Sequence, residues 1–218
     1  MIMKRLFVLF ITITALVSNT ANSQDQKAVE ILESMQERFE QSIEDIDDYI
    51  MEKEDHTIYY KKATTENGSP YFKTKTKGDY ESESAANKDL YSQFSSQAKE
   101  KATYEGTDEV DGNEVHVIYI DQMKTESFSP GRDTENTIKD IYLYIDSDKL
   151  VIRKMEYTTK SQVEVGEVRE ISLVINNRDF RNVEGMLIPY ETATVANDSY
   201  EKVSKVKEIK VNTGMEDF

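Results

Sequence analysis

The apolar residues change their spacing once along the chain, and this change constrains the fold more than any other feature of the sequence. Between Asp25 and Asp48 they recur every three or four residues, which predicts an amphipathic helix. The residues with this spacing are Ala28, Ile31, Leu32, Met35, Phe39, Ile43 and Ile46. From Tyr49 onward most segments have the alternating pattern of strands, so a sheet must cover the apolar stripe of the helix.

Short turns separate the expected strands, which indicates that neighbouring strands pair antiparallel. Asp111-Gly112 and the segment 146–148 each lie at the centre of an expected hairpin, and Asn176, Asn177 and Gly185 lie in a polar turn between two later strands. The expected strands cover residues 49–62, 71–76, 103–110, 113–121, 140–146, 149–159, 170–176 and 186–195, whereas residues 200–211 fit either a strand or a helix. A weak helical pattern covers residues 88–101, and residues 124–137 form a long polar loop. The chain is therefore expected to be an antiparallel meander that curls around its first helix.

The first residues have the pattern of a secretory signal peptide. Lys4 and Arg5 precede an uncharged apolar run of 12 residues, 6–17, and small polar residues follow. We expect cleavage after Ser23, leaving residues 24–218 as a single domain. A membrane anchor is the alternative, but a spanning helix needs about 20 apolar residues and this run is shorter.

The charge and the absence of cysteine exclude several classes of protein. The chain has 27 Lys and Arg against 42 Asp and Glu, a net charge of −15, and Lys4 and Arg5 belong to the expected leader, so the remainder carries −17. Such an acidic domain repels the phosphates of DNA and RNA, and we expect no nucleic-acid partner. The absence of Cys excludes disulfides, thiolate metal sites, a Cys nucleophile and a lipid-modified N-terminal Cys.

Residues suited to catalysis are few and lie apart. The eight Gly are isolated, so no dinucleotide-binding or phosphate-binding loop can be assembled from them. His56 lies in a charged stretch and His116 alternates within an expected strand, and neither has a placed partner. The acids within 44–48 could attract Ca²⁺, but their spacing does not match a calcium-binding loop and a solvated face is the favoured interpretation. We expect no enzymatic activity, no metal and no cofactor.

The apolar residues leave two interpretations open. The chain has 13 Tyr, 8 Phe and 8 Met, many of them at alternating strand positions or on the first helix. They could form an ordinary packed core. They could also enclose an incompletely filled interior that accepts lipid chains.

Several segments resemble the periplasmic outer-membrane lipoprotein-sorting proteins of the LolA/LolB-like family. Residues 104–120, 142–157 and 179–192 are similar to consecutive strands of that family. The resemblance lies in the Asp-Gly hairpin, the strand that ends in Ile-Asp, and the Leu-Ile-Pro that follows a glycine turn. Residues 31–49 resemble its opening helix, and residues 208–218 resemble its closing strand, which favours a strand over 200–211.

The resemblance implies an α+β fold: a half-open antiparallel β-barrel, a meander of about seven to nine strands, curled over an N-terminal helix and a short second helix. It also implies an apolar cavity that carries lipoprotein acyl chains or lipid across the periplasm, and the missing Cys favours a soluble carrier over a membrane-anchored acceptor. We expect the protein to be a monomer, with an envelope membrane protein as a candidate partner. The residues expected to line the cavity are Met35, Phe39, Val117, Tyr119, Ile141, Leu143, Ile145, Met155, Ile171, Leu173, Ile175 and Leu187. Arg132 and Arg153 are both candidates for the arginine that locks a lid in this family.

A regulatory or interaction protein of the same fold is the alternative function. Periplasmic sensors that bind an anti-sigma partner share this fold, and they need no lipid transport. In that case the acidic surface would be the binding surface.

Overall fold

The computed structural model describes residues 25–64, 68–78, 87–88, 98–126, 135–164 and 167–215. These ranges contain a helix over residues 25–42 and eleven strands. The strands are β1 Asp48–Lys53, β2 His56–Thr64, β3 Pro70–Gly78, β4 Asn87–Lys88, β5 Ala102–Val110, β6 Asn113–Glu126, β7 Glu135–Asp146, β8 Ile152–Glu164, β9 Glu167–Val183, β10 Met186–Ala196 and β11 Tyr200–Val211.

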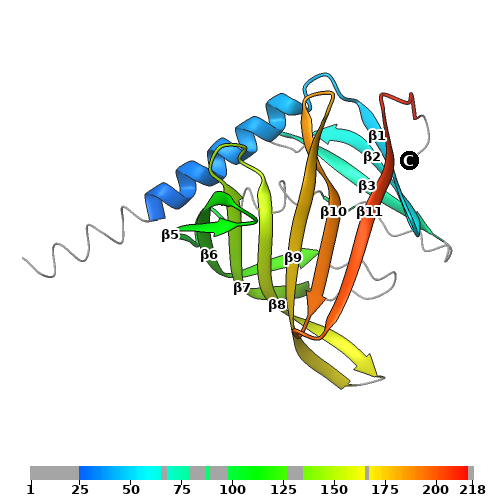
Figure 1. The fold of residues 1–218 in the computed structure, drawn as a ribbon. Helices are drawn as coiled ribbons and strands as arrows, with labels where there is room; N and C mark the ends of the chain where they lie inside the picture. The colour runs from blue at the N-terminus through cyan, green and yellow to red at the C-terminus, as the bar shows by residue number, and fades with distance from the viewer. Residues whose placement is uncertain are drawn as a thin grey trace, which may run out of the picture.

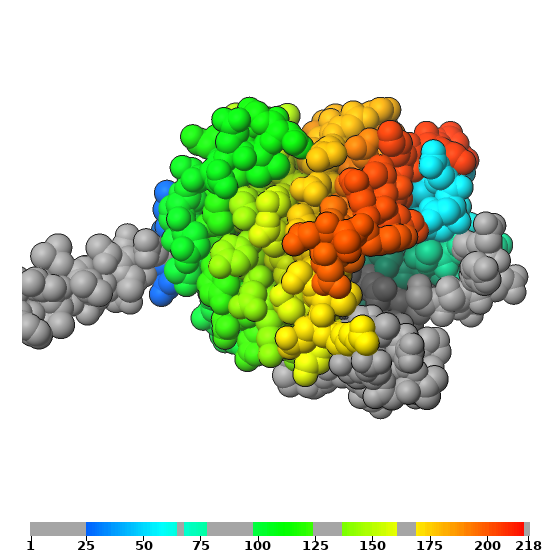
Figure 2. Space-filling view, turned by 60° about the horizontal axis from the view of Figure 1, so that its bottom comes forward, coloured from blue at the N-terminus to red at the C-terminus, as the bar shows by residue number. Residues whose placement is uncertain are grey.

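The strands form one antiparallel sheet in which the last strand of the chain pairs with the first one. The strand order is β4-β3-β2-β1-β11-β10-β9-β8-β7-β6-β5, because β11 pairs with β1. In Figure 2 the surface changes from green through yellow and orange to red and then to cyan, which places β11 beside the earliest strands. The two ends of this order, β4 and β5, do not pair with each other within the described ranges. The sheet is therefore a half-open barrel, and the helix lies across it (Figure 1), as the sequence predicts.

The helix and the turn that follows it pack against the sheet through two separate groups of buried side chains. The first cluster joins the early part of the helix to β5–β8, with Ile118, Ile141, Leu143 and Ile145 fully buried. The second cluster joins the residues after the helix to β1–β3, β10 and β11, with Phe72 fully buried at its centre. Each fully buried aliphatic or aromatic side chain contributes about 1.5–3 kcal/mol, so these clusters hold the curl of the sheet against the helix.

The hairpin between β5 and β6 forms at the expected turn. Asp111 has φ 49° and Gly112 has φ 76°. Two successive residues with positive φ give the turn that matches the twist of a two-residue hairpin, and glycine adopts such a φ without a steric penalty.

Several expected boundaries differ from the structure, and three of these differences change the course of the chain. The helix ends at residue 42 and not at Asp48, because the next residues form a tight turn in which Ile46 N donates to Ile43 O at 3.2 Å, and Asp48 already belongs to β1. The single strand expected over 49–62 is the hairpin of β1 and β2, which turns at residues 54–55. Asn176 and Asn177 lie inside β9, and the turn before β10 is Glu184-Gly185, where both residues have positive φ.

Other expectations fall partly or wholly outside the described residues. Within 88–101 the structure describes Lys88 at the end of β4 and the turn at residues 98–101, so the second helix stays a prediction. The leader over 1–23 lies outside the described ranges, and the single domain over 24–218 stays a prediction. Across the described part of the chain, no helix combines the length and the apolar character that crossing a bilayer requires.

Candidate functional site

A cavity of about 410 Å³ lies between the helix and the concave face of the sheet. Residues from the helix, β1, β2, β3, β8, β9 and β10 line it. The lining residues are Met35, Arg38, Phe39, Ser42, Tyr49, Met51, Lys53, Tyr60, Thr74, Leu150, Val151, Ile152, Met155, Ile175, Asn177, Phe180, Gly185, Met186, Leu187, Ile188, Pro189 and Thr192. Met35 and Met155 belong to the first cluster and Tyr49 and Met186 to the second, so the cavity lies where the two clusters meet.

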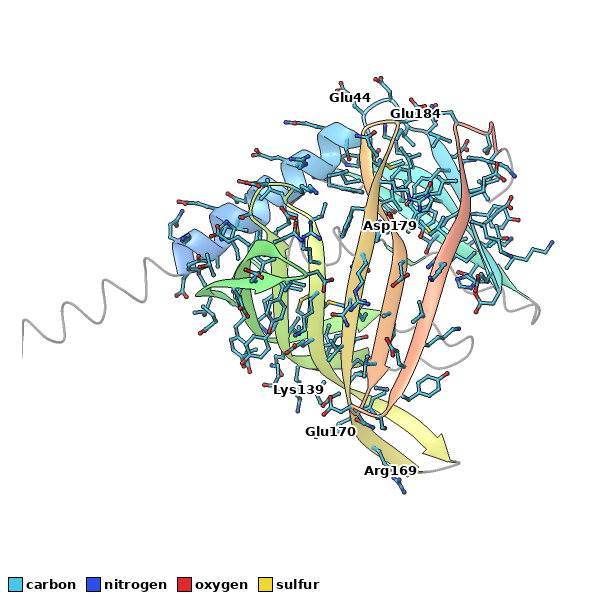
Figure 3. All side chains as sticks on the ribbon, in the orientation of Figure 1. Glu44, Lys139, Arg169, Glu170, Asp179 and Glu184 are labelled. Atoms are coloured by element: carbon cyan, nitrogen blue, oxygen red, sulfur yellow. The ribbon has the colours of Figure 1, made fainter. Side chains whose placement is uncertain are left out.

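The cavity reaches the end of the helix. Met35, Arg38, Phe39 and Ser42 follow one another at steps of three, one and three residues, which places them on one face of the helix. Gly185 lies close by, since a Cβ on it would be 3.6 Å from the Ser42 carbonyl oxygen. Figure 3 shows Glu44 and Glu184 at this end of the molecule, and Lys139, Arg169 and Glu170 at the opposite end.

Aromatic rings form the wall on the β1 side. Tyr49 stacks on Tyr60 with ring centroids 4.0 Å apart, and Phe72 meets Tyr49 edge-on at 5.0 Å. Tyr49 and Tyr60 are directly paired across β1 and β2, which is the close cross-strand position in which aromatic pairs stabilise a sheet. The rings give this wall a rigid apolar surface.

The polar side chains on the β9–β10 side bond to the protein itself. The Asn177 amide donates to Ile152 O at 3.0 Å, and the Thr192 hydroxyl donates to Asn177 Oδ1 at 3.1 Å. At the helix end, the Ser42 hydroxyl donates to Phe39 O at 2.7 Å. Each of these groups already has a hydrogen-bond partner in the protein, so none of them needs a ligand to be satisfied.

The charged lining residues are both cations. Arg38 lies on the helix, where its Nη1 donates to Asp148 O at 3.5 Å, and Lys53 lies at the end of β1. The described lining residues include no Asp or Glu. Burial lowers the pKa of Lys53, and the charge of Lys202 lowers it further while Asp55 opposes both.

The structure brings five of the twelve expected lining residues to the cavity. Met35, Phe39, Met155, Ile175 and Leu187 line it. They come from the helix, β8, β9 and β10, which lie far apart in the sequence.

The other seven expected residues lie elsewhere. Ile141, Leu143 and Ile145 are fully buried in the first cluster, where the helix packs on them. Ile171 and Leu173 are half-buried on the same face of β9 as Ile175, outside the described cavity. Val117 and Tyr119 pair with Tyr144 and Tyr142 and therefore point to the opposite face of the sheet from Ile141, Leu143 and Ile145.

The structure places Arg153 in a buried ion pair. Its guanidinium donates to Asp146 Oδ2 at 2.6 Å and to Asn113 Oδ1 at 3.0 Å, and its side chain is 8% exposed. Burial raises the pKa of Asp146, but hydrogen bonds from the Lys149 amide and Arg153 outweigh it and hold that pKa below its usual value. The ion pair joins the end of β7 to β8, and the bond to Asn113 joins β8 to the start of β6. The guanidinium is thus engaged within the fold, and a lid-locking role for Arg153 stays a prediction. Arg132 lies outside the described residues.

The two histidines lie away from the cavity lining. His56 Nδ1 lies 2.6 Å from Asp55 Oδ1, and His116 Nδ1 lies 3.5 Å from the Tyr104 hydroxyl. Burial lowers the pKa of His116. In the parts of the chain that the structure describes, no three His, Cys, Asp or Glu residues converge on a point that could hold a metal ion, and Asp48 instead accepts hydrogen bonds from Thr213 and the residues after it.

Lys53 is the lining residue that the sequence concealed most completely. It lies between Glu52 and Glu54 in a stretch of charges, which is typical of a solvated loop. The alternation of Tyr49, Met51 and Lys53 is the signal that could have found it, because every second strand residue shares a face.

Comparisons with known proteins identify the fold. No protein-family model and no curated protein matches the chain. Among solved structures, a domain from Vibrio parahaemolyticus that is named for outer membrane lipoprotein sorting has 10% identity and a TM-score of 0.48, covering 88% of this chain and 95% of that one. A DUF1329 family protein from Desulfovibrio piger also has 10% identity, with a TM-score of 0.50 and the same coverage of 88% and 95%. The chain shares its fold with the Desulfovibrio piger protein. That similarity concerns the fold alone, and the function has to be argued from the cavity.

Proposed function

We propose that this protein is a periplasmic carrier that binds an acyl chain of a lipoprotein or lipid in the cavity between its helix and its sheet. The observation that carries the proposal is the cavity of about 410 Å³, whose described lining is mostly apolar and includes no carboxylate. Pockets that hold one small ligand have volumes of roughly 300–1,000 Å³ and are mostly apolar with a few polar groups.

The energetics of such a site are favourable without any coupled reaction. Transfer of each CH₂ group out of water contributes about 0.8 kcal/mol, so a chain of about 16 carbons supplies on the order of 10 kcal/mol. The net charge of the chain favours a ligand inside the cavity over one on the surface. A chain with a net charge of −15 is repelled by anionic lipid surfaces, so a lipid that it carries should sit inside the cavity and not on its surface.

Two features of the sequence support the proposed cargo and the proposed compartment. The resemblance of the strand segments to LolA/LolB-like proteins supports a lipoprotein or lipid cargo, and the expected leader supports export to the periplasm. A membrane protein of the envelope that loads or receives the cargo completes the proposal.

Uptake of a fluorescent fatty acid tests the proposal, with two variants of neighbouring residues on β9. Ile175 lines the cavity, whereas Val174 points to the opposite face of the same strand. Ile175→Trp places an indole in the cavity and should weaken uptake about tenfold or more, while Val174→Trp should bind as the wild type does.

The uptake measured for the two variants distinguishes binding in the cavity from binding elsewhere. Saturable uptake that Ile175→Trp removes and Val174→Trp keeps supports the proposal. No uptake by the delipidated wild-type protein contradicts it, and so does equal uptake by the two variants.

A further inference from the structure

The charge of the cavity differs in sign from the charge of the chain. Asp and Glu outnumber Lys and Arg by 42 to 27, yet the described lining residues contain Arg38 and Lys53 and no acid. A cavity for an uncharged chain alone does not need a cation in its wall, and partial desolvation of an ammonium without a partner costs free energy. Arg38 is exposed and donates to Asp148 O, whereas Lys53 is half-buried, so Lys53 is the cation that indicates a ligand with a negative group.

Lys53 is placed to meet such a group. It shares a face of β1 with Tyr49 and Met51, and all three line the cavity. Lys53 lies four residue steps along the strand from Tyr49, which is about 13 Å, so an apolar surface leads from the helix end of the cavity to the ammonium.

The acids beside Lys53 in the sequence do not neutralise it. Glu52 accepts from Lys210 at 2.6 Å on the opposite face of β1. Asp55 accepts from Lys202 at 3.0 Å and contacts His56 at 2.6 Å, and these two bonds lower the pKa of Asp55 to about 2. Glu54 is exposed in the turn.

Lys53 itself makes no hydrogen bond or close ion pair with any residue that the structure describes. Its electrostatic neighbours are Asp55, which is already bonded, and Lys202, which repels it. The Lys53 ammonium is thus a half-buried donor whose hydrogen bonds are available to a ligand.

We propose that the cavity binds a single-chain amphiphile with an anionic head group, a carboxylate or a phosphate, and that the Lys53 ammonium pairs with that head group. The inference rests on the proposed carrier function and specifies its ligand. The volume of about 410 Å³ lies near the lower end of the range for ligand pockets, which suits one chain. The apolar tail lies along Tyr49 and Met51, and the head group completes the hydrogen bonds of Lys53.

Isothermal titration with three ligands of equal chain length tests the head group. The probes are hexadecanoate, hexadecyl phosphate and the uncharged hexadecanol, and the proteins are the wild type, Lys53→Met, Lys53→Arg and Lys205→Met. Lys205 is the matched control, since it lies on the outer face of β11, where it pairs with Glu191 at 3.1 Å.

We expect the wild type to bind at least one anionic probe about tenfold or more tightly than hexadecanol. Lys53→Met should lose this preference while its affinity for hexadecanol stays unchanged, Lys53→Arg should keep part of it, and Lys205→Met should keep all of it. The two anionic probes distinguish a carboxylate head group from a phosphate head group.

A measurement on the wild-type protein makes the test independent of the variants. A bound anion favours the charged form of Lys53, so the pKa of Lys53, followed by NMR of its side chain, should rise with the anionic probe and not with hexadecanol. Equal affinity of the wild type for all three probes overturns the inference but leaves the carrier function standing. A preference that survives Lys53→Met overturns the role of Lys53, and no binding of any probe refutes the carrier function as well.

Discussion

Replacing Arg153 with Met removes the cation from a buried ion pair and should destabilise the fold by about 3 kcal/mol. The side chains of Arg153 and Asp146 are 8% and 4% exposed, and Arg153 Nη2 lies 2.6 Å from Asp146 Oδ2. Breaking a buried pair by removing one partner typically costs about 3–5 kcal/mol, because the other charge stays buried. Asp146 keeps its hydrogen bonds from the amides of Lys149 at 2.7 Å and Asp148 at 3.0 Å, which places the expected loss at the lower end of that range.

Urea unfolding at pH 7 measures this loss as a shift of the midpoint with an unchanged slope. Arg178→Met is the matched control, because Arg178 is 45% exposed and lies 3.2 Å from Asp111, so its loss should cost less than about 1 kcal/mol. The double variant Arg153→Met with Asp146→Asn should recover part of the stability, since it leaves no buried charge.

A loss with Arg153→Met as small as that with Arg178→Met would refute the reasoning. Unchanged stability together with altered release of a bound lipid would instead support a lid-locking role for Arg153.

Two further substitutions test the packing of Phe72 and the hydrogen bonds of Asp48. Phe72→Ala should destabilise the protein by about 3–5 kcal/mol, because Phe72 is fully buried, and thermal unfolding that stays unchanged would contradict this packing. Burial raises the pKa of Asp48, but hydrogen bonds from Thr213, Met215 and Gly214 outweigh it and lower that pKa below 3.8. The stabilisation by ionised Asp48 should therefore be complete above about pH 4 and should disappear as the pH falls through the native pKa. At pH 7 the Asp48→Asn variant should be less stable than the wild type by about 1–3 kcal/mol. Urea titrations should show this difference narrowing below pH 4. A gap that is independent of pH would contradict the assignment.

The sequence predicts the parts of this fold that depend on local chemistry. Asp111-Gly112 marks its hairpin because few residues other than Gly, Asn and Asp tolerate positive φ. The turn at residues 54–55 contains no Gly, Pro or Asn, and its one favourable turn residue, Asp55, is hidden in a run of charged residues, so the sequence predicts one strand where the structure has β1 and β2. The pairing of β1 with β11 joins segments at opposite ends of the chain, and spacing alone gives no sign of it.

The candidate site was harder to predict than the fold. Alternation shows which strand residues share a face, but it does not show whether the helix covers them. Ile141 and Ile175 therefore looked equivalent, although the first is buried under the helix and the second lines the cavity. The sequence does not indicate Lys53 as a lining residue, because its neighbours in the sequence are charged. Its place in the cavity wall depends on the curl of the sheet.

The central claim is that the cavity holds an acyl chain in the protein as it occurs in the cell. Native mass spectrometry of protein purified from its own envelope, without detergent, tests this claim most directly. We predict a population heavier than the apo protein, whose extra mass dissociates as an acyl species and is absent from Ile175→Trp prepared in the same way. A clean apo mass for the wild type, with no acyl species in the extracted sample, would contradict the account.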